Sequence, residues 1–131
     1  MCCLCVSQVY NNTLRNWPLL GVKCQLAIQP ILYLVKSNLS SEIAFNDLVT
    51  QIASQLGWIV LNVPRTSAFG IPCVRSMYEH VAELYDNCTY HGYTNGDILF
   101  DDGLARTLHA VAKVSTPQTK LQYLVVVKVK G

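Results

Sequence analysis

The sequence predicts an α/β fold of three layers, with a mixed or parallel sheet between helices on both faces. Segments rich in apolar and β-branched residues alternate along the chain with segments whose apolar residues recur at helical spacing. Hydrophobic residues make up 51% of the sequence and charged residues only 14%, a composition that excludes a disordered chain. The length of 131 residues suits one core, and no linker or repeat interrupts it, so residues 1–131 are expected to form a single domain.

The N-terminal segment is expected to begin with a strand. Leu4–Tyr10 is rich in β-prone residues, and the Asn-Asn-Thr sequence at 11–13 supplies residues that break a strand. Leu14–Gly21 is then expected to be irregular, because a proline disfavours helical backbone at the residue before it, and Trp17 precedes Pro18.

The next apolar stretch is expected to form two extended pieces rather than one strand. A proline has no N–H to donate and is excluded from the middle of a central strand, so Pro30 is expected to divide the stretch. We expect a strand over Lys23–Ile28 and a second extended piece over Ile31–Val35. Ser37–Ser41 then supplies residues that begin helices.

The clearest helix in the sequence follows. Its apolar residues recur with helical spacing, and Gly57 suits the position just after the last helical turn. Trp58 leads into a strand over Ile59–Val63, whose nearly continuous apolar character predicts a central strand buried on both faces. The apolar residues of the helix are Ile43, Phe45, Leu48, Val49, Ile52, Ala53 and Leu56.

The second half of the chain continues the alternation. An amphipathic helix is expected over Cys73–Tyr85, because apolar residues recur along one of its faces. A polar connection over Asp86–Gly96 leads to a short strand over Asp97–Phe100, and Asp101 or Asp102 is expected to cap a further helix. A loop over Ser115–Thr119 and a β-branched strand over Leu121–Val129 end the chain.

The charge balance and the cysteines limit the classes of function. Ten basic residues nearly offset eight acidic ones, so a net charge of +2 does not indicate nucleic-acid binding. No apolar run approaches the ~20 residues that a membrane span needs. The six cysteines are spaced too irregularly for a secreted disulfide scaffold, so a reducing, cytoplasmic setting is expected. Low charge with high apolar content predicts that a protein partner or another copy of the chain covers part of the surface.

The loop over Pro64–Pro72 is the strongest candidate for a binding site. An apolar strand leads through it into the helix expected from Cys73, and the first turn of a helix offers unpaired N–H groups to an anion. The alternative is an ordinary strand-to-helix turn in which Gly70 supplies an unusual φ. Arg65 can pair with a phosphate and Phe69 can stack on a ribose or base. The expected ligand-binding residues of the loop are Arg65, Ser67, Ala68, Phe69, Gly70 and Ile71.

The run from Ile59 to Pro72, Ile-Val-Leu-Asn-Val-Pro-Arg-Thr-Ser-Ala-Phe-Gly-Ile-Pro, resembles the second ligand loop of macrodomains, the ADP-ribose-binding family. In that family a buried strand ends in proline. A serine- and glycine-rich turn then leads through an aromatic-glycine-x-proline sequence into a helix. Cys24–Pro30 and Phe45–Leu56 resemble the strand and middle helix that come earlier in the family, and Asp97–Asp101 resembles its late strand and acidic turn. The likeness covers roughly Cys24–Val111.

The resemblance implies a module, reduced at its N-terminus, that binds ADP-ribose or a related nucleotide phosphate. Asn11 and Asn12 are similar to the asparagine-rich turn of the family's first ligand loop, but the glycine run that follows this turn in the family is absent here. Such modules occur in viral replicase polyproteins and in multidomain proteins. No cofactor and no metal are expected.

Two other classes of function stay open. A protein-interaction or structural domain without a small ligand fits the low charge and the short loops. An enzyme would be an ADP-ribosyl hydrolase, or a thiol hydrolase with Cys73 at a helix N-terminus as its nucleophile. His80 lies seven residues further on, a helical rise of ~10 Å that is too long for a direct hydrogen bond. No catalytic residue is therefore assigned.

Two clusters of polar residues have structural alternatives. Asp97, Asp101 and Asp102 can bind an adenine amino group or a metal, but aspartates at these positions also cap helices. Cys88 and His91 can form a zinc site with cysteines 2, 3 and 5, although the spacings match no closed zinc site.

Overall fold

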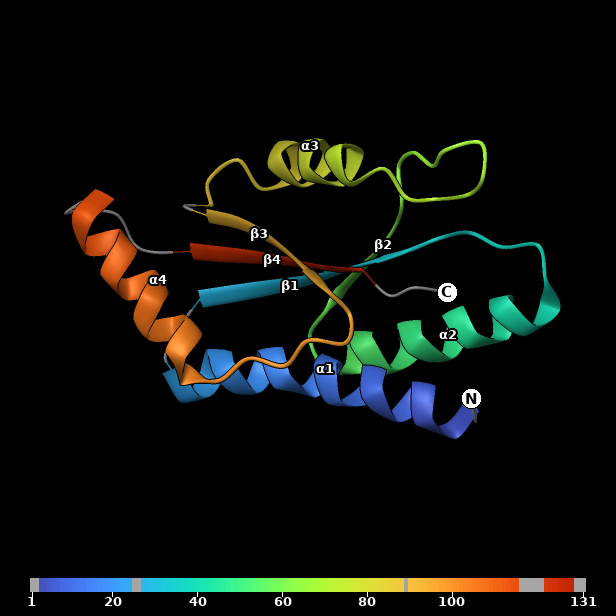
Figure 1. The fold of residues 1–131 in the computed structure, drawn as a ribbon, viewed down its shortest axis with the longest axis horizontal. Coiled ribbons are helices and arrows are strands. Elements are labelled where there is room, and N and C mark those ends of the chain that lie inside the picture. The colour runs from blue at the N-terminus through green and yellow to red at the C-terminus, as the bar shows by residue number, and fades with distance from the viewer. Residues whose placement is uncertain (1–2, 25–26, 89, 116–121, 129–131) are drawn as a thin grey trace.

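The computed structural model describes residues 3–24, 27–88, 90–115 and 122–128, and it confirms the α/β class. Helices and strands alternate along these residues (Figure 1). In chain order they are α1 (Cys3–Cys24), β1 (Ala27–Leu34), α2 (Ser40–Gln55), β2 (Ile59–Asn62), α3 (Val74–Leu84), β3 (Tyr90–Asn95), α4 (Asp102–Ser115) and β4 (Gln122–Lys128).

The described strands form one parallel sheet in the order β2-β1-β4-β3. In the register, Ile31 of β1 is opposite Ile59 of β2, and Ala27 is opposite Gln122 of β4. Tyr123 of β4 is in turn opposite Tyr90 of β3. The two central strands, β1 and β4, therefore come from opposite ends of the chain.

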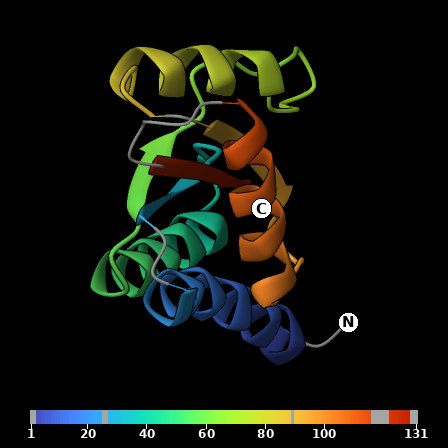
Figure 2. The same cartoon turned by 90° about the vertical axis from the view of Figure 1, so that its left-hand side faces the viewer.

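Side chains of β1 alternate between two cores, one on each face of the sheet. Leu32 and Leu34 belong to a core with residues of α1 and α2, while Ile31 and Tyr33 pack against Met77 and Val81 of α3. Figure 2 shows α3 on one side of the sheet and α1 and α2 on the other. Full burial of such side chains contributes roughly 1.5–3 kcal/mol each, so β1 is the strand on which both cores depend.

The N-terminal expectations are wrong, because α1 replaces both the strand expected over Leu4–Tyr10 and the irregular segment after it. Leu14, Trp17 and Leu20 recur at helical spacing and are almost completely buried against the sheet. Burial of this face overrides the local preferences for strand and turn that the sequence shows.

Pro18 lies inside α1, where a proline normally destabilises a helix. It has no N–H to donate to the carbonyl of Leu14, four residues earlier. The indole Nε1–H of Trp58 donates to that carbonyl instead, at 2.8 Å. The helix thus continues through the proline because a buried side chain from the start of β2 supplies the missing donor.

The division expected at Pro30 is also wrong, since β1 is continuous from Ala27 to Leu34. The β1–β2 ladder begins only at Ile31, so Pro30 has a strand partner on the β4 side alone. The side-chain Nε2 of Gln29 donates to the Pro30 carbonyl at 3.1 Å and to the Gly57 carbonyl at 3.3 Å. The carbonyl of Pro30 therefore points toward Gly57, on the β2 side of β1. The nitrogen of a strand residue points to the same side as its carbonyl, so the N–H that Pro30 lacks would also face β2, where the ladder has not yet begun.

Two further strand expectations are wrong, and the helix expectations are confirmed. β2 lies at the edge of the sheet and its side chains are half-buried or exposed, so it is not a central strand. The strand expected over Asp97–Phe100 is instead a connection, and β3 lies in the segment Asp86–Gly96 that was expected to be a polar loop. An edge strand needs little apolar character, which is why Tyr-His-Gly-Tyr-Thr-Asn was not recognised. Residues 116–119 of the expected loop lie outside the described residues.

Replacing Trp58 by Phe is expected to lower the free energy of unfolding by about 2–4 kcal/mol, because it removes buried area and leaves the Leu14 carbonyl without its donor. In a Pro18→Ala background the helix regains its own N–H donor, so the same change is expected to cost about 1 kcal/mol less. Urea unfolding of the four proteins measures this difference. Equal costs in the two backgrounds would contradict the role given to the indole. Trp17→Phe is a matched control, because its buried N–H has no partner among the described residues.

Candidate functional site

At the carboxyl edge of the parallel sheet, the connections that follow β1 and β2 pass to opposite faces of the sheet. After β1 the chain passes to α2 on one face, and after β2 it passes to α3 on the other (Figures 1 and 2). Connections that separate in this way leave a crevice between neighbouring strand ends, where ligands bind in open α/β sheets.

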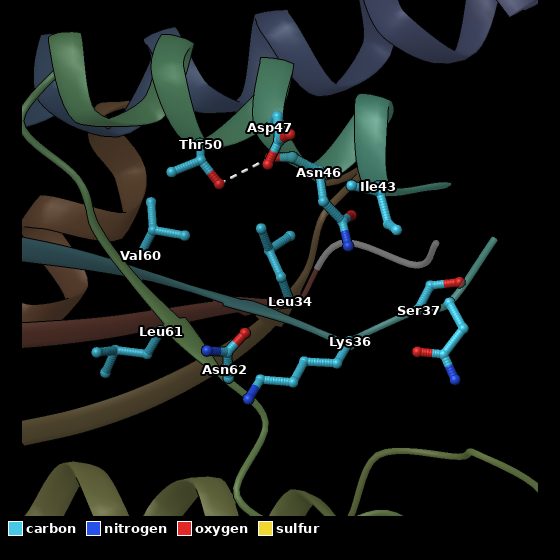
Figure 3. Close-up of a pocket in the computed structure, with 11 residues that line it drawn as sticks. Leu34, Lys36, Ser37, Ile43, Asn46, Asp47, Thr50, Val60, Leu61 and Asn62 are labelled. Atoms are coloured by element: carbon cyan, nitrogen blue, oxygen red, sulfur yellow. Dashed lines mark hydrogen bonds between the residues drawn. The ribbon is translucent and has the colours of Figure 1, made fainter. Parts of the chain in front are cut away.

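A pocket of about 380 Å³ lies at this switch between β1 and β2. Its volume is at the lower end of the range of roughly 300–1,000 Å³ for small-molecule sites. Figure 3 shows it between α2 and the ends of the two strands. The lining residues are Leu34, Lys36, Ser37, Asn38, Ile43, Asn46, Asp47, Thr50, Val60, Leu61 and Asn62.

Local hydrogen bonds hold the wall made by α2 and the β1–α2 connection. The Nδ2 of Asn46 donates to the Val35 carbonyl at 3.0 Å, which ties the connection to the helix. The hydroxyl of Thr50 donates to the Asn46 carbonyl at 2.7 Å. The Leu39 N–H donates to the Ser37 hydroxyl at 3.1 Å, just before α2 begins at Ser40. Hydrogen bonds within the β1–α2 connection and α2 therefore hold this wall in place without a ligand.

Lys36 and Asp47 are the charged residues among those that line the pocket. Neither belongs to the ion pairs of the described residues, which are Arg75–Glu79 and Arg106–Asp102. In Figure 3 the Lys36 amine lies near Asn62, Asp47 projects from α2 on the other side, and Leu34 lies between them. The pocket thus separates a cation and an amide from a carboxylate across an apolar floor.

The pocket was missed in the sequence, although a signal was present. Lys36, Ser37 and Asn38 come directly after β1, and Asn62 ends β2, so polar residues follow two neighbouring strands. Since β1 was divided at Pro30 and β2 was expected in the centre, the two strand ends were not placed side by side.

The predicted loop residues 65 and 67–71 lie between β2 and α3, at the same edge of the sheet, and all of them are exposed. The loop closes on itself through Ser67. Its hydroxyl accepts from the N–H groups of Phe69 and Ile71, both at 3.2 Å, and its carbonyl accepts from Gly70 at 3.0 Å. Gly70 has a φ of 74°, as expected for a turn glycine. A phosphate bound at these N–H groups would have to displace bonds that the loop already makes.

Asn11 and Asn12 lie on α1, away from the predicted loop. The side-chain oxygen of Asn11 accepts from Arg15 Nε at 3.1 Å. α1 and α3 cover opposite faces of the sheet (Figure 1), so the structure does not bring the two asparagines to the 65–71 loop.

Cys73 and His80, the pair considered for thiol chemistry, have different partners. The Ser76 N–H, hydrogen-bonded to the sulfur, is the main cause that lowers the pKa of the Cys73 thiol, and the nearby charge of Arg65 adds to it. His80 Nδ1 instead lies 2.7 Å from the Tyr33 hydroxyl. Burial, together with Tyr85, raises the pKa of Tyr33 to about 12, so this hydroxyl stays neutral. Cys73 therefore has hydrogen bonds that lower the pKa of its thiol, whereas His80 contacts the Tyr33 hydroxyl.

Three residues of the other polar clusters, Asp101, Asp102 and His91, have local partners, while the side chains of cysteines 2, 3 and 5 lie outside the part that the structure describes. Asp101 Oδ1 accepts from the Gly103 N–H at 2.8 Å, as a helix cap does, and Asp102 pairs with Arg106 at 3.3 Å. His91 Nε2 contacts the Tyr85 carbonyl at 3.1 Å. Within the described residues, no group of three or more His, Cys, Asp or Glu can hold a metal ion, and no helix is long and apolar enough to cross a membrane.

No protein-family model, curated protein or solved structure matches this chain. The likeness to macrodomains therefore remains an expectation that rests on the residues quoted above. The geometry of the carboxyl edge is the basis for assigning a function.

Cys73 is expected to react with iodoacetamide at neutral pH faster than Cys88. The pKa of the Cys73 thiol is lowered by its hydrogen bonds at the start of α3, whereas burial raises the pKa of the Cys88 thiol. Mass spectrometry of tryptic peptides after timed alkylation gives the two rates. A Cys73 rate equal to or below that of Cys88 would show that the thiol is not activated, and would also remove the thiol-hydrolase alternative.

Proposed function

We propose that this protein is a binding module for ADP-ribose or a related nucleotide phosphate, with its site at the carboxyl edge between β1 and β2. The observation that carries the proposal is the pocket at this switch point, whose lining includes Lys36, a lysine outside the ion pairs of the described residues. We also propose that the three layers are arranged as in macrodomains. The support for this is the resemblance of the run from Ile59 to Pro72, and of the segments around it, to that family.

The chemistry of the lining supports a phosphate ligand. A lysine ammonium makes charge-assisted hydrogen bonds to phosphate oxygens, and Lys36 is exposed at the mouth of the pocket. The amide of Asn62 adds a donor beside it, and Leu34 offers apolar contact to a sugar or base. ADP-ribose has a sugar at each end of its diphosphate, so Arg65 and Phe69 of the loop after β2 would contact the part that extends beyond the pocket.

Binding, rather than hydrolysis, is the activity that this lining favours. Among the described residues that line the pocket there is no cysteine or histidine, and Asp47 is the one carboxylate. Cys73, whose thiol pKa is lowered, lies at the start of α3 and is not among the described residues that line the pocket. A role as an ADP-ribosyl hydrolase is therefore not proposed.

Titration calorimetry with ADP-ribose tests the proposal. Lys36→Met is expected to weaken binding by about tenfold to a hundredfold, because it removes a charge-assisted hydrogen bond. Lys113→Met, on the exposed surface of α4, is the matched control and is expected to bind as the wild type does. Gly70→Val strains a turn at positive φ and is expected to weaken binding if the loop contacts the ligand. No heat at millimolar ADP-ribose, or equal affinity in Lys36→Met, would end the proposal.

A protein-interaction role is the second candidate, and the tip of the 64–72 loop favours it. Phe69 is 91% exposed and Ile71 is 60% exposed, on a loop that the Ser67 hydrogen bonds and the Thr66–Pro72 bridge hold in one conformation. An ordered loop that presents an aromatic residue to solvent is a feature of protein-binding surfaces.

If copies of the chain associate through this tip, Phe69→Asp is expected to shift the molar mass measured by light scattering from a dimer or larger species to the monomer. Leu84→Asp, on the exposed end of α3, is the control for an added charge elsewhere. A wild-type protein that is monomeric at every concentration would exclude self-association through the tip.

A further inference from the structure

We infer that the pocket between β1 and β2 is a pentose-phosphate subsite, in which Lys36 holds the phosphate and Asp47 accepts hydrogen bonds from the sugar hydroxyls. The inference deepens the proposed function and rests on it, since it names the part of the nucleotide that enters the pocket. Its basis is the separation of opposite charges across one small cavity.

The charge pattern disfavours a ligand that is only an anion. Asp47 and Lys36 line the same pocket of about 380 Å³, so a bare phosphate near the lysine is repelled by the carboxylate. The two side chains do not neutralise each other, because neither belongs to an ion pair of the described residues. The matching ligand carries negative charge at one end and hydrogen-bond donors at the other.

The neutral residues favour hydroxyl groups as those donors. Amide side chains of Asn38 and Asn62 and the hydroxyl of Ser37 line the pocket, and each offers both donors and acceptors to a sugar. Asn46 also lines the pocket, and one of its amide N–H groups is engaged with the Val35 carbonyl. A vicinal diol presents donors and acceptors together and can use the donors and acceptors of these groups at once, whereas a ligand ammonium presents donors alone.

The apolar residues and the volume fit a compact sugar. Leu34 lies between Lys36 and the helix in Figure 3, and Val60 also lines the pocket, so the middle of the pocket offers apolar contact to the ring carbons. About 380 Å³ is small for a whole dinucleotide and leaves the rest of the ligand outside.

Asp47→Asn tests this inference, because it is expected to change the affinities for ribose 5-phosphate and for inorganic phosphate in opposite directions. The change keeps the shape of the side chain but removes its negative charge. Ribose 5-phosphate is expected to bind about tenfold more weakly to Asp47→Asn, since a neutral amide accepts hydroxyl hydrogen bonds less strongly than a carboxylate. Inorganic phosphate is expected to bind severalfold more tightly, because the repulsion is gone.

Chemical-shift titrations of the ¹⁵N-labelled protein give both affinities. Asp86→Asn is the matched control, an exposed carboxylate between α3 and β3 at the opposite edge of the sheet, and both ligands are expected to bind it as they bind the wild type. With the wild type, 2-deoxyribose 5-phosphate is expected to bind severalfold more weakly than ribose 5-phosphate. A change of the same sign for ribose 5-phosphate and inorganic phosphate in Asp47→Asn would overturn the inference, and so would tighter binding of a zwitterionic amino acid than of ribose 5-phosphate.

Failure of the inference and failure of the proposed function give different results. If ADP-ribose binds and depends on Lys36 but Asp47→Asn leaves ribose 5-phosphate unchanged, the pentose subsite is wrong and the nucleotide function stands. If ribose 5-phosphate shows the opposite-sign pattern but ADP-ribose does not bind, the subsite stands and the nucleotide function is wrong.

Discussion

The hydrogen bond from the Trp58 indole to the Leu14 carbonyl is the contact on which the N-terminal half of the fold depends. α1 covers one face of the sheet and contains Pro18, so its backbone has a carbonyl that no helical N–H can reach. Trp58 supplies the donor and at the same time fills the core between α1 and α2. Gly57, with a φ of 84°, ends α2 and brings Trp58 into that position. One residue therefore joins a helix end, a strand start and a distant helix.

The sequence predicted those parts of the fold whose signals are local. α2, α3, α4 and β4 have amphipathic or β-branched patterns, and the structure confirms all of them. The errors at Pro18 and Pro30 share a cause. Each proline was expected to interrupt its element because it has no N–H donor, but the side chain of another residue donates the hydrogen bond instead. Trp58 is forty residues from Pro18 in sequence, so no local pattern reveals the contact. Gln29 is adjacent to Pro30, but its role depends on where the β1–β2 ladder begins.

The predicted loop and the pocket lie at the same edge of the sheet but share no residue. The strand-to-helix loop was placed after β2, where it lies, but its N–H groups are paired within the loop. The pocket needs the end of β1, the end of β2 and one face of α2 together. That juxtaposition depends on strand order, which follows from tertiary packing and not from the residues of any one segment. A loop with glycine and proline is easy to recognise in a sequence, whereas a crevice between two strands is not.

The Gln29–Pro30 pair also bears on how β1 can pair with other strands. Residues 27–30 of β1 extend past the ladder with β2, so among the described strands this part of β1 has no partner on that side. An open strand edge normally recruits a strand from another molecule through its free N–H and carbonyl groups. Here the proline has no N–H to offer, and the Gln29 amide already occupies the carbonyl. The proline that concealed β1 in the sequence therefore leaves no free N–H at the point where the β1–β2 ladder begins.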